Sequence, residues 1–152
     1  MKRRSSLLVD LSMVAKALIR PVVFGVCGVV EDGQGQVLLV RHTYVGGWHL
    51  PGGGVGWGEP PENAVMRELE EETGLAESTA PAFVALYSRK VFWTTNLIAL
   101  YRLRNARIDF KPNLEIREAR FFDSADLPDG TTEATQRRLA ELAGKAPRTP
   151  YW

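Results

Sequence analysis

The sequence predicts an α/β fold in which a mixed β-sheet lies between helices. Strand-like and helix-like segments alternate along the chain, and the strand-like ones are rich in β-branched residues. Some of these runs are apolar throughout, which is typical of strands covered on both faces. With 152 residues, 45% hydrophobic and 24% charged, the chain has the size and composition of one globular domain.

The first 20 residues predict an amphipathic helix. Polar and charged residues interrupt its apolar side, so the segment matches neither a signal peptide nor a membrane span. We expect this helix, residues 1–20, to pack on its own domain or on a second subunit of a homodimer. A membrane-surface helix steered by the basic start is the alternative. The apolar stripe consists of Leu7, Leu11, Val14 and Leu18.

The main domain, residues 21–145, begins with two strands, 21–30 and 37–40. Residues 31–35 between them have turn chemistry, so we expect a hairpin. The second half predicts a hairpin of strands 82–88 and 94–103 with its tip at 89–93. A strand at 115–122 and a helix at 131–143 follow. Residues 146–152 are expected to be a mobile C-terminal tail unless Tyr151 and Trp152 dock.

Residues 52–58 predict a glycine-rich loop, and residues 61–73 predict a helix. Pro60 and Pro61 suit the first helical turn, and Gly74 suits a left-handed cap at the end. No Gly-Lys-Ser/Thr follows the glycines and the GxGxxG spacing is absent, so neither a P-loop nor a dinucleotide-binding fingerprint is present.

The predicted helix carries three acids on one face, Glu68, Glu71 and Glu72. Like charges at such spacings cost roughly 0.2–0.5 kcal/mol per pair, and they lie near the negative end of the helix. Arg67 can pair with Glu71, but one arginine cannot neutralise the whole group. Mg²⁺ and Mn²⁺ prefer carboxylate oxygens and water, so a divalent cation site competes here with a simply solvated acidic face.

The stretch from Gly53 to Leu75 resembles the Nudix box without one departure. It has Gly53, five residues, Glu59, seven residues, Arg67-Glu68, an aliphatic residue, any residue, Glu71-Glu72, any residue, Gly74 and an aliphatic residue. Trp48 to Gly53 is similar to the segment that precedes the box in that family. The resemblance implies a Nudix-type α/β/α sandwich. It also implies hydrolysis of a diphosphate linkage by water, with Mg²⁺ or Mn²⁺ as cofactor.

The resemblance further implies roles for individual residues. Glu68 or Glu115 would be the general base, and Arg67 and Glu59 would orient the other glutamates. Glu115 fits the additional glutamate of the family, which lies before a later strand, better than Glu118 does. The implied metal ligands are the Gly52 carbonyl, Glu68, Glu71, Glu72 and Glu115.

The substrate class is indicated mainly by absences. The signatures of relatives specific for ADP-ribose, dinucleoside polyphosphates, NADH or coenzyme A are missing. We therefore expect a nucleoside diphosphate derivative. The alternatives are a nucleoside triphosphate pyrophosphohydrolase, a nucleotide-sensing module without activity, and a prenyl diphosphate isomerase. Candidate substrate contacts are Trp57 and Trp93 for a base, and Arg41, Arg89 and Lys90 for phosphate.

Charge and cysteine content exclude other classes. A formal charge of +1 shows no excess for binding a nucleic-acid polymer, so we expect a small-molecule nucleotide as partner. The single cysteine, Cys27, cannot form an internal disulfide, which suits a reducing cytoplasmic compartment. With His42 and His49 as the only histidines, a zinc site has too few ligands.

Overall fold

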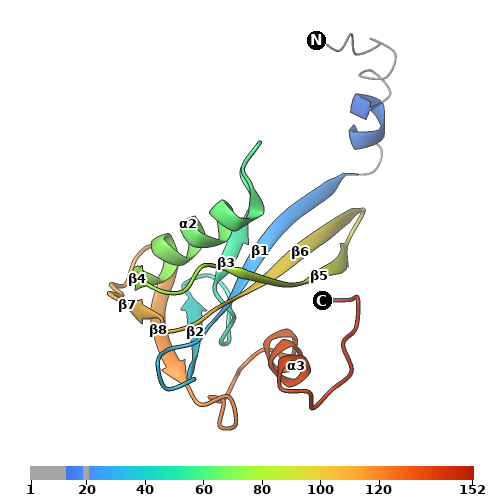
Figure 1. Ribbon diagram of the computed structural model, residues 1–152. Coiled ribbons are helices and arrows are strands. Elements are labelled where there is room, and N and C mark those ends of the chain that lie inside the picture. The colour runs from blue at the N-terminus through green and yellow to red at the C-terminus, as the bar shows by residue number, and fades with distance from the viewer. Residues whose placement is uncertain (1–12, 19–20) are drawn as a thin grey trace.

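The computed structural model describes residues 13–18 and 21–152 (Figure 1). Eight strands and two helices with assigned bounds follow one another from residue 22 onward. In chain order they are β1 Val22–Val30, β2 Val37–His42, β3 Gly52–Gly54, α2 Pro61–Thr73, β4 Leu75–Glu77, β5 Ala82–Val91, β6 Thr94–Leu103, β7 Arg107–Ile108, β8 Ile116–Phe122 and α3 Glu133–Leu142.

A four-stranded mixed sheet in the order β3-β1-β6-β5 forms the centre. Strand β1 runs parallel to β6, whereas β1–β3 and β5–β6 are antiparallel pairs. Strands β2 and β8 form a separate antiparallel pair, and so do β4 and β7. The mixed sheet predicted from the sequence is therefore confirmed.

The predicted hairpin between the first two strands is wrong. Strand β2 pairs with β8, and only a single bridge, Glu31 to Val37, links the end of β1 to the start of β2. The turn itself forms, because Asp32 Oδ1 accepts the N–H groups of Gln34 and Gln36 at 2.8 and 2.9 Å. The strands then diverge because β6 and β3 occupy the two edges of β1.

Helices α2 and α3 lie on opposite sides of the strands (Figure 1). The alternation of side chains along each strand sends one set to each helix. On β2, Leu38 joins the core under α2 and Leu39 joins the core under α3. Leu69 of α2 and Leu139 of α3 are buried in these two cores. The result is the α/β/α sandwich that the sequence predicts.

Helix α2 has the predicted bounds. Gly74 ends it in the left-handed region at φ 65°, and its N–H donates to the Glu70 carbonyl at 2.9 Å. Helix α3 starts after Thr132, whose hydroxyl accepts the Thr135 N–H at 3.4 Å. Strand β5 extends to Val91, so Arg89 and Lys90 belong to the strand and the hairpin tip contains Phe92 and Trp93.

Most of the predicted N-terminal helix lies outside the described residues. Residues 13–18 are helical, and Met13, Val14 and Leu18 expose 63%, 58% and 79% of their surface. In the part of the chain that the structure describes, no helix has the length and apolar character needed to cross a membrane.

The C-terminal residues dock on strand β5, as the sequence allowed for Tyr151 and Trp152. The Ser88 N–H donates to the Pro150 carbonyl at 2.8 Å, and the Trp152 N–H donates to the Ser88 carbonyl at 3.1 Å. Tyr151 thereby forms a parallel bridge with Ser88.

Candidate active site

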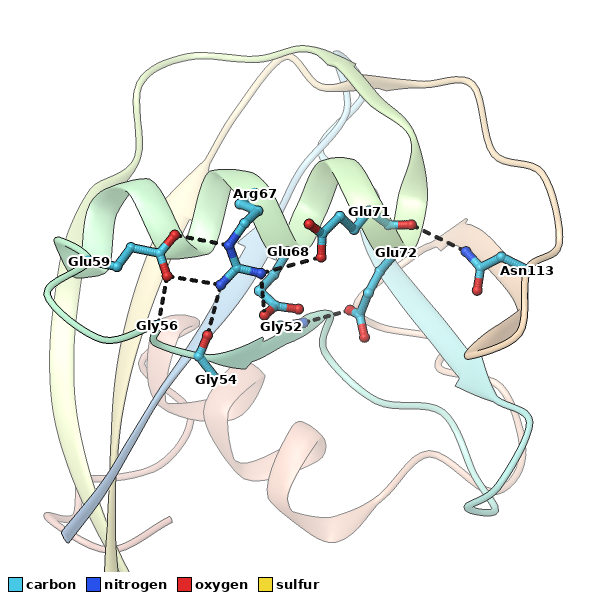
Figure 2. A network of polar contacts seen from close by, with 9 residues as sticks. All are labelled: Gly52, Gly54, Gly56, Glu59, Arg67, Glu68, Glu71, Glu72 and Asn113. Carbon is cyan, nitrogen blue, oxygen red and sulfur yellow. Dashed lines mark hydrogen bonds and ion pairs between the residues drawn. The ribbon is translucent and has the colours of Figure 1, made fainter.

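Arg67 on helix α2 is the centre of a polar network (Figure 2). Its guanidinium donates to both carboxylate oxygens of Glu59, at 2.9 and 3.0 Å. It also donates to Glu68 at 2.8 Å and to Glu71 at 3.3 Å. A further bond at 2.9 Å reaches the Gly54 carbonyl on β3. Arg67 thus ties the loop before α2, strand β3 and the acidic face of the helix together.

Glu59 fixes the position of Arg67. Its Oε2 accepts the Gly56 N–H at 2.7 Å in addition to the bonds from Arg67. These hydrogen bonds, chiefly the one from Arg67, hold the pKa of Glu59 down at about 2. Glu59 is therefore charged at all physiological pH values, and the two-point contact sets the plane of the guanidinium.

Glu72 is the buried member of the acidic group, with 5% of its surface exposed. Its Oε2 accepts the Gly52 N–H at 2.8 Å. Burial, together with the weaker effect of the charges of Glu68, Glu115 and Glu71, raises the pKa of Glu72 to about 7, although the hydrogen bond from Gly52 lowers it. Burial and like charges both oppose ionisation, so a nearby cation would favour the charged form.

At Gly52 and Gly53, strand β3 leaves no room for a side chain larger than hydrogen. A Cβ on Gly53 would overlap the Glu68 carboxylate, and one on Gly52 would overlap the backbone of Val26. Gly52 has φ +147°, a backbone conformation that other residues rarely adopt. The glycines therefore bring backbone amides within reach of the glutamates.

Asn113 attaches the loop that carries Glu115 to the end of α2. Its Nδ2 donates to the Glu71 carbonyl at 3.2 Å, and its Oδ1 accepts the N–H groups of Glu115 and Ile116 at 2.9 and 2.8 Å. Glu115 thereby lies close enough to raise the pKa of Glu72. Glu118, the alternative, pairs instead with Arg41 and Arg120, each at 3.1 Å.

The donor set suits a hard divalent cation, since it consists of carboxylates and backbone oxygens. Burial and the neighbouring carboxylates disfavour the charged form of Glu72, and a bound cation would offset both effects. Among residues 13–18 and 21–152, however, no three His, Cys, Asp or Glu side chains converge as a preformed metal site. Arg67 bonds one oxygen of each neighbouring carboxylate, Glu68 Oε1 and Glu71 Oε2, so the second oxygen of each is the one that could contact a cation.

A pocket of about 540 Å³ lies on the other side of β3, between the central sheet and α3. Gly52 and Gly53 belong both to its wall and to the contacts with the glutamates. Cys27 also lines it, and burial, followed by the charges of Glu72 and Glu68, raises the pKa of its thiol to about 12. The thiol is therefore protonated, and the acids lie close to this part of the pocket.

Arg89 is the one candidate substrate contact from the sequence that lines this pocket. Lys90 is the next residue of β5 and does not line it. Trp57 and Trp93 are almost fully exposed and also lie outside its wall. The Arg41 guanidinium pairs with Glu118 and lies over the Trp48 ring, 5.4 Å from its centroid.

Most residues of the pocket wall carry no signal in the sequence. His42 and His49 both line it, with ring centroids 5.2 Å apart, and burial lowers the pKa of His42 so that its ring favours the neutral form. Trp152 lines it because the C-terminal residues dock. No local motif marks these positions, since the contacts join segments far apart in the chain. The start of helix α3 and the residue before it contribute Thr132, Glu133, Ala134, Thr135 and Arg137.

Comparison with known proteins gives consistent results. The family model described as the NUDIX domain matches residues 21–143. An RNA pyrophosphohydrolase of Proteus mirabilis is 35% identical over 96 residues, which cover 62% of this chain and 49% of that protein. An RNA pyrophosphohydrolase of Saccharophagus degradans is 47% identical over 53 residues, covering 33% of this chain and 30% of that protein. The matches thus span half or less of the length of these relatives.

The fold is also similar to that of a solved structure. The crystal structure of a MutT NUDIX hydrolase from Burkholderia pseudomallei is 26% identical to this chain, with a TM-score of 0.69. The similarity covers 81% of this chain and 99% of that one.

Proposed function

The chain belongs to the NUDIX domain family, and from that premise we propose that it is a metal-dependent hydrolase that cleaves a diphosphate linkage in a nucleoside diphosphate derivative. One observation carries the proposal. Strand β3 lies between a group of glutamates and a pocket of about 540 Å³, a volume suited to a small ligand. The pocket would hold the nucleotide, and the glutamates would act where its diphosphate passes β3.

Glu68, Glu71, Glu72, Glu115 and the Gly52 carbonyl are the residues that would hold Mg²⁺ or Mn²⁺. When bound, such an ion neutralises the diphosphate and lowers the pKa of water. Arg67 would position Glu68 and Glu71 and would keep them from swinging away, as its contacts at 2.8 and 3.3 Å support.

In the proposed reaction, a water oxygen attacks phosphorus, the P–O bond to the leaving phosphoryl group breaks, and a glutamate accepts the water proton. We assign that proton to Glu115. Within the described part of the chain its carboxylate has no hydrogen bond or ion pair, whereas Glu68 already accepts a bond from Arg67. Glu115→Gln should then lower kcat more than Glu68→Gln does, because only Glu115→Gln removes the proton acceptor.

Charge in the pocket supports an anionic ligand. Arg89 of β5 and Arg137 of α3 line it together with the acidic side chain of Glu133, and Thr132 and Thr135 add hydroxyl groups. Arg89 is thus the proposed phosphate contact from the sequence analysis that the geometry favours most. Arg41, Trp57, Lys90 and Trp93 do not line this pocket, and in this proposal they serve at most parts of the substrate outside it.

The names of the bacterial relatives favour a second candidate. Two of them are called RNA pyrophosphohydrolase, which suggests removal of pyrophosphate from a triphosphate end. In this protein the same glutamates would act on the triphosphate, and the rest of an RNA strand would extend out of the pocket into solvent.

Product analysis by mass spectrometry separates these candidates. The purified protein would be incubated with Mg²⁺ or Mn²⁺ and with nucleotide sugars, nucleoside triphosphates and a triphosphorylated RNA oligonucleotide. Two monophosphate-bearing products from a linked diphosphate support the first proposal. Pyrophosphate released only from triphosphates contradicts it and supports the second. Nucleotide binding without any turnover would support the nucleotide-sensing alternative and exclude both.

A further inference from the structure

The C-terminal residues carry a feature that the proposed chemistry does not use. Residues 148–152 run along strand β5, and the end of the chain lies beside the central sheet (Figure 1). Besides the bonds of Pro150 and Trp152 to Ser88, the Arg148 guanidinium donates to the Val84 carbonyl at 3.3 Å. These contacts extend the sheet by a short segment at the β5 edge.

A fully buried arginine holds this segment. Arg138 of α3 has 0% of its surface exposed, and it donates to the Tyr151 carbonyl at 2.8 Å and to Glu141 at 2.7 Å. The Tyr87 hydroxyl donates to the other Glu141 oxygen at 2.9 Å. The guanidinium also lies 4.1 Å from the centroid of the Tyr87 ring. A buried ion pair costs desolvation, and the Arg138 Nε–H has no hydrogen-bond partner among the described residues, so the bonds of the two terminal nitrogens have to offset this cost. Those bonds also fix the backbone of the segment.

The consequence of this anchoring is the position of one side chain. The Trp152 ring packs edge-on against Tyr87, with centroids 5.6 Å apart, and the Arg138 guanidinium lies 5.5 Å from the Trp152 ring centroid. Trp152 is only partly buried, and it lines the pocket together with Arg89 and Arg137. A fixed aromatic ring and two cations thus line the same pocket.

We propose that Trp152 is the residue on which the substrate's nucleobase stacks, and that the Arg138 cluster exists to present it. The inference rests on the proposed function and names the part of the substrate that the pocket takes. Base stacking on an aromatic side chain is tolerant of base identity, since every base has a π face. Arg89 and Arg137 would then meet phosphate groups of the same nucleotide. Trp57 and Trp93 do not line the pocket and cannot serve a base bound there.

The test measures binding without turnover. Metal-free protein is titrated with AMP, GMP, CMP and UMP, and with ribose 5-phosphate as a ligand that has the phosphate but no base. Trp152→Ala should weaken binding of the nucleoside monophosphates by about tenfold or more and leave ribose 5-phosphate unchanged. Trp152→Phe retains a ring and should recover most of the affinity. In turnover assays, Trp152→Ala should raise KM and leave kcat within about twofold.

Several outcomes would overturn the proposal. An equal loss for ribose 5-phosphate would show that Trp152 only supports the pocket wall. A loss in Trp93→Ala instead of Trp152→Ala would move the stacking residue to the hairpin tip, and an intact protein that binds no nucleoside monophosphate would remove the base site altogether. If nucleotide binding depends on Trp152 but no substrate is hydrolysed, the base site stands and the proposed hydrolysis fails.

Discussion

The N–H of Gly52 donates a 2.8 Å hydrogen bond to Oε2 of Glu72, which joins strand β3 to the buried end of helix α2. This bond is one of the few stabilising contacts for a carboxylate that burial and neighbouring charges otherwise disfavour. It also places the acid directly behind the glycine that lines the pocket.

Without metal, the protein should lose stability as pH rises from about 4.5 to about 7. The pKa of Glu72 is raised from 4.5 to about 7, so the folded state binds more protons than the unfolded state across that range. The free energy of unfolding should fall by up to about 3 kcal/mol from this group alone. Denaturant unfolding in EDTA at several pH values measures the slope.

Mg²⁺ should reverse that loss, because it binds the charged form of the acids. The melting temperature should rise with Mg²⁺ more at pH 8 than at pH 5. Glu72→Gln is the matched control, since it keeps a hydrogen-bond acceptor for Gly52 and removes the titration. An unchanged pH slope in that variant would mean that another group is responsible.

Glu72→Gln should lower kcat by roughly 10³ or more, a transition-state loss of about 4 kcal/mol, while the protein stays folded. The reason is that the proposed metal site loses a charge without losing shape. Steady-state kinetics with saturating Mn²⁺ measure kcat, and a circular dichroism spectrum shows whether the variant is folded. Turnover near the wild-type rate would show that Glu72 is not part of the site.

Arg67→Ala should lower kcat by about 10–100-fold, because Glu59, Glu68 and Glu71 all lose their shared partner. Arg107→Ala is the control of the same chemistry, since it removes an exposed ion pair to Glu77 outside the site. Comparable losses in both variants would point to a general effect of charge instead of positioning. Arg67→Lys keeps the charge but cannot make the two-point contact to Glu59, so it should recover little of the activity that Arg67→Ala loses.

Gly53→Ala should lower kcat by at least about tenfold, since the new methyl group overlaps the Glu68 carboxylate and displaces it. Gly33→Ala is the control, because a Cβ there meets nothing within 4 Å. Kinetics and melting temperature are compared for the two variants. Full activity of Gly53→Ala would show that hydrolysis does not depend on the observed position of the Glu68 carboxylate.

Deleting residues 1–19 should change the oligomeric state or reduce solubility. We propose that the N-terminal helix packs its apolar stripe against a second subunit, because Val14 and Leu18 of the stripe are exposed on a single chain. Light scattering coupled to size-exclusion chromatography measures the mass before and after deletion. Binding of the intact protein to anionic vesicles, lost on deletion, would instead favour the membrane-surface alternative.

Local chemistry explains what could be predicted from the sequence. The bounds of α2, its cap at Gly74 and the acidic face depend on residues within a few positions of one another, so spacing alone determines them. The pairing of Arg67 with Glu71 follows from the same spacing. The continuous apolar runs likewise predict strands covered on both faces.

Only the tertiary structure decided which distant segments meet. The burial of Glu72 follows from the close passage of β3, and the sequence pattern assigned it to the same face as the exposed Glu71. The pairing of β2 with β8 instead of β1 depends on which strand edges remain available after β6 has paired. Arg138 is fully buried because Glu141 and the docked C-terminal residues accept hydrogen bonds from its terminal nitrogens and the Tyr87 ring packs against it. Such contacts have no local signal, since their free energy exists only when all the partners are assembled.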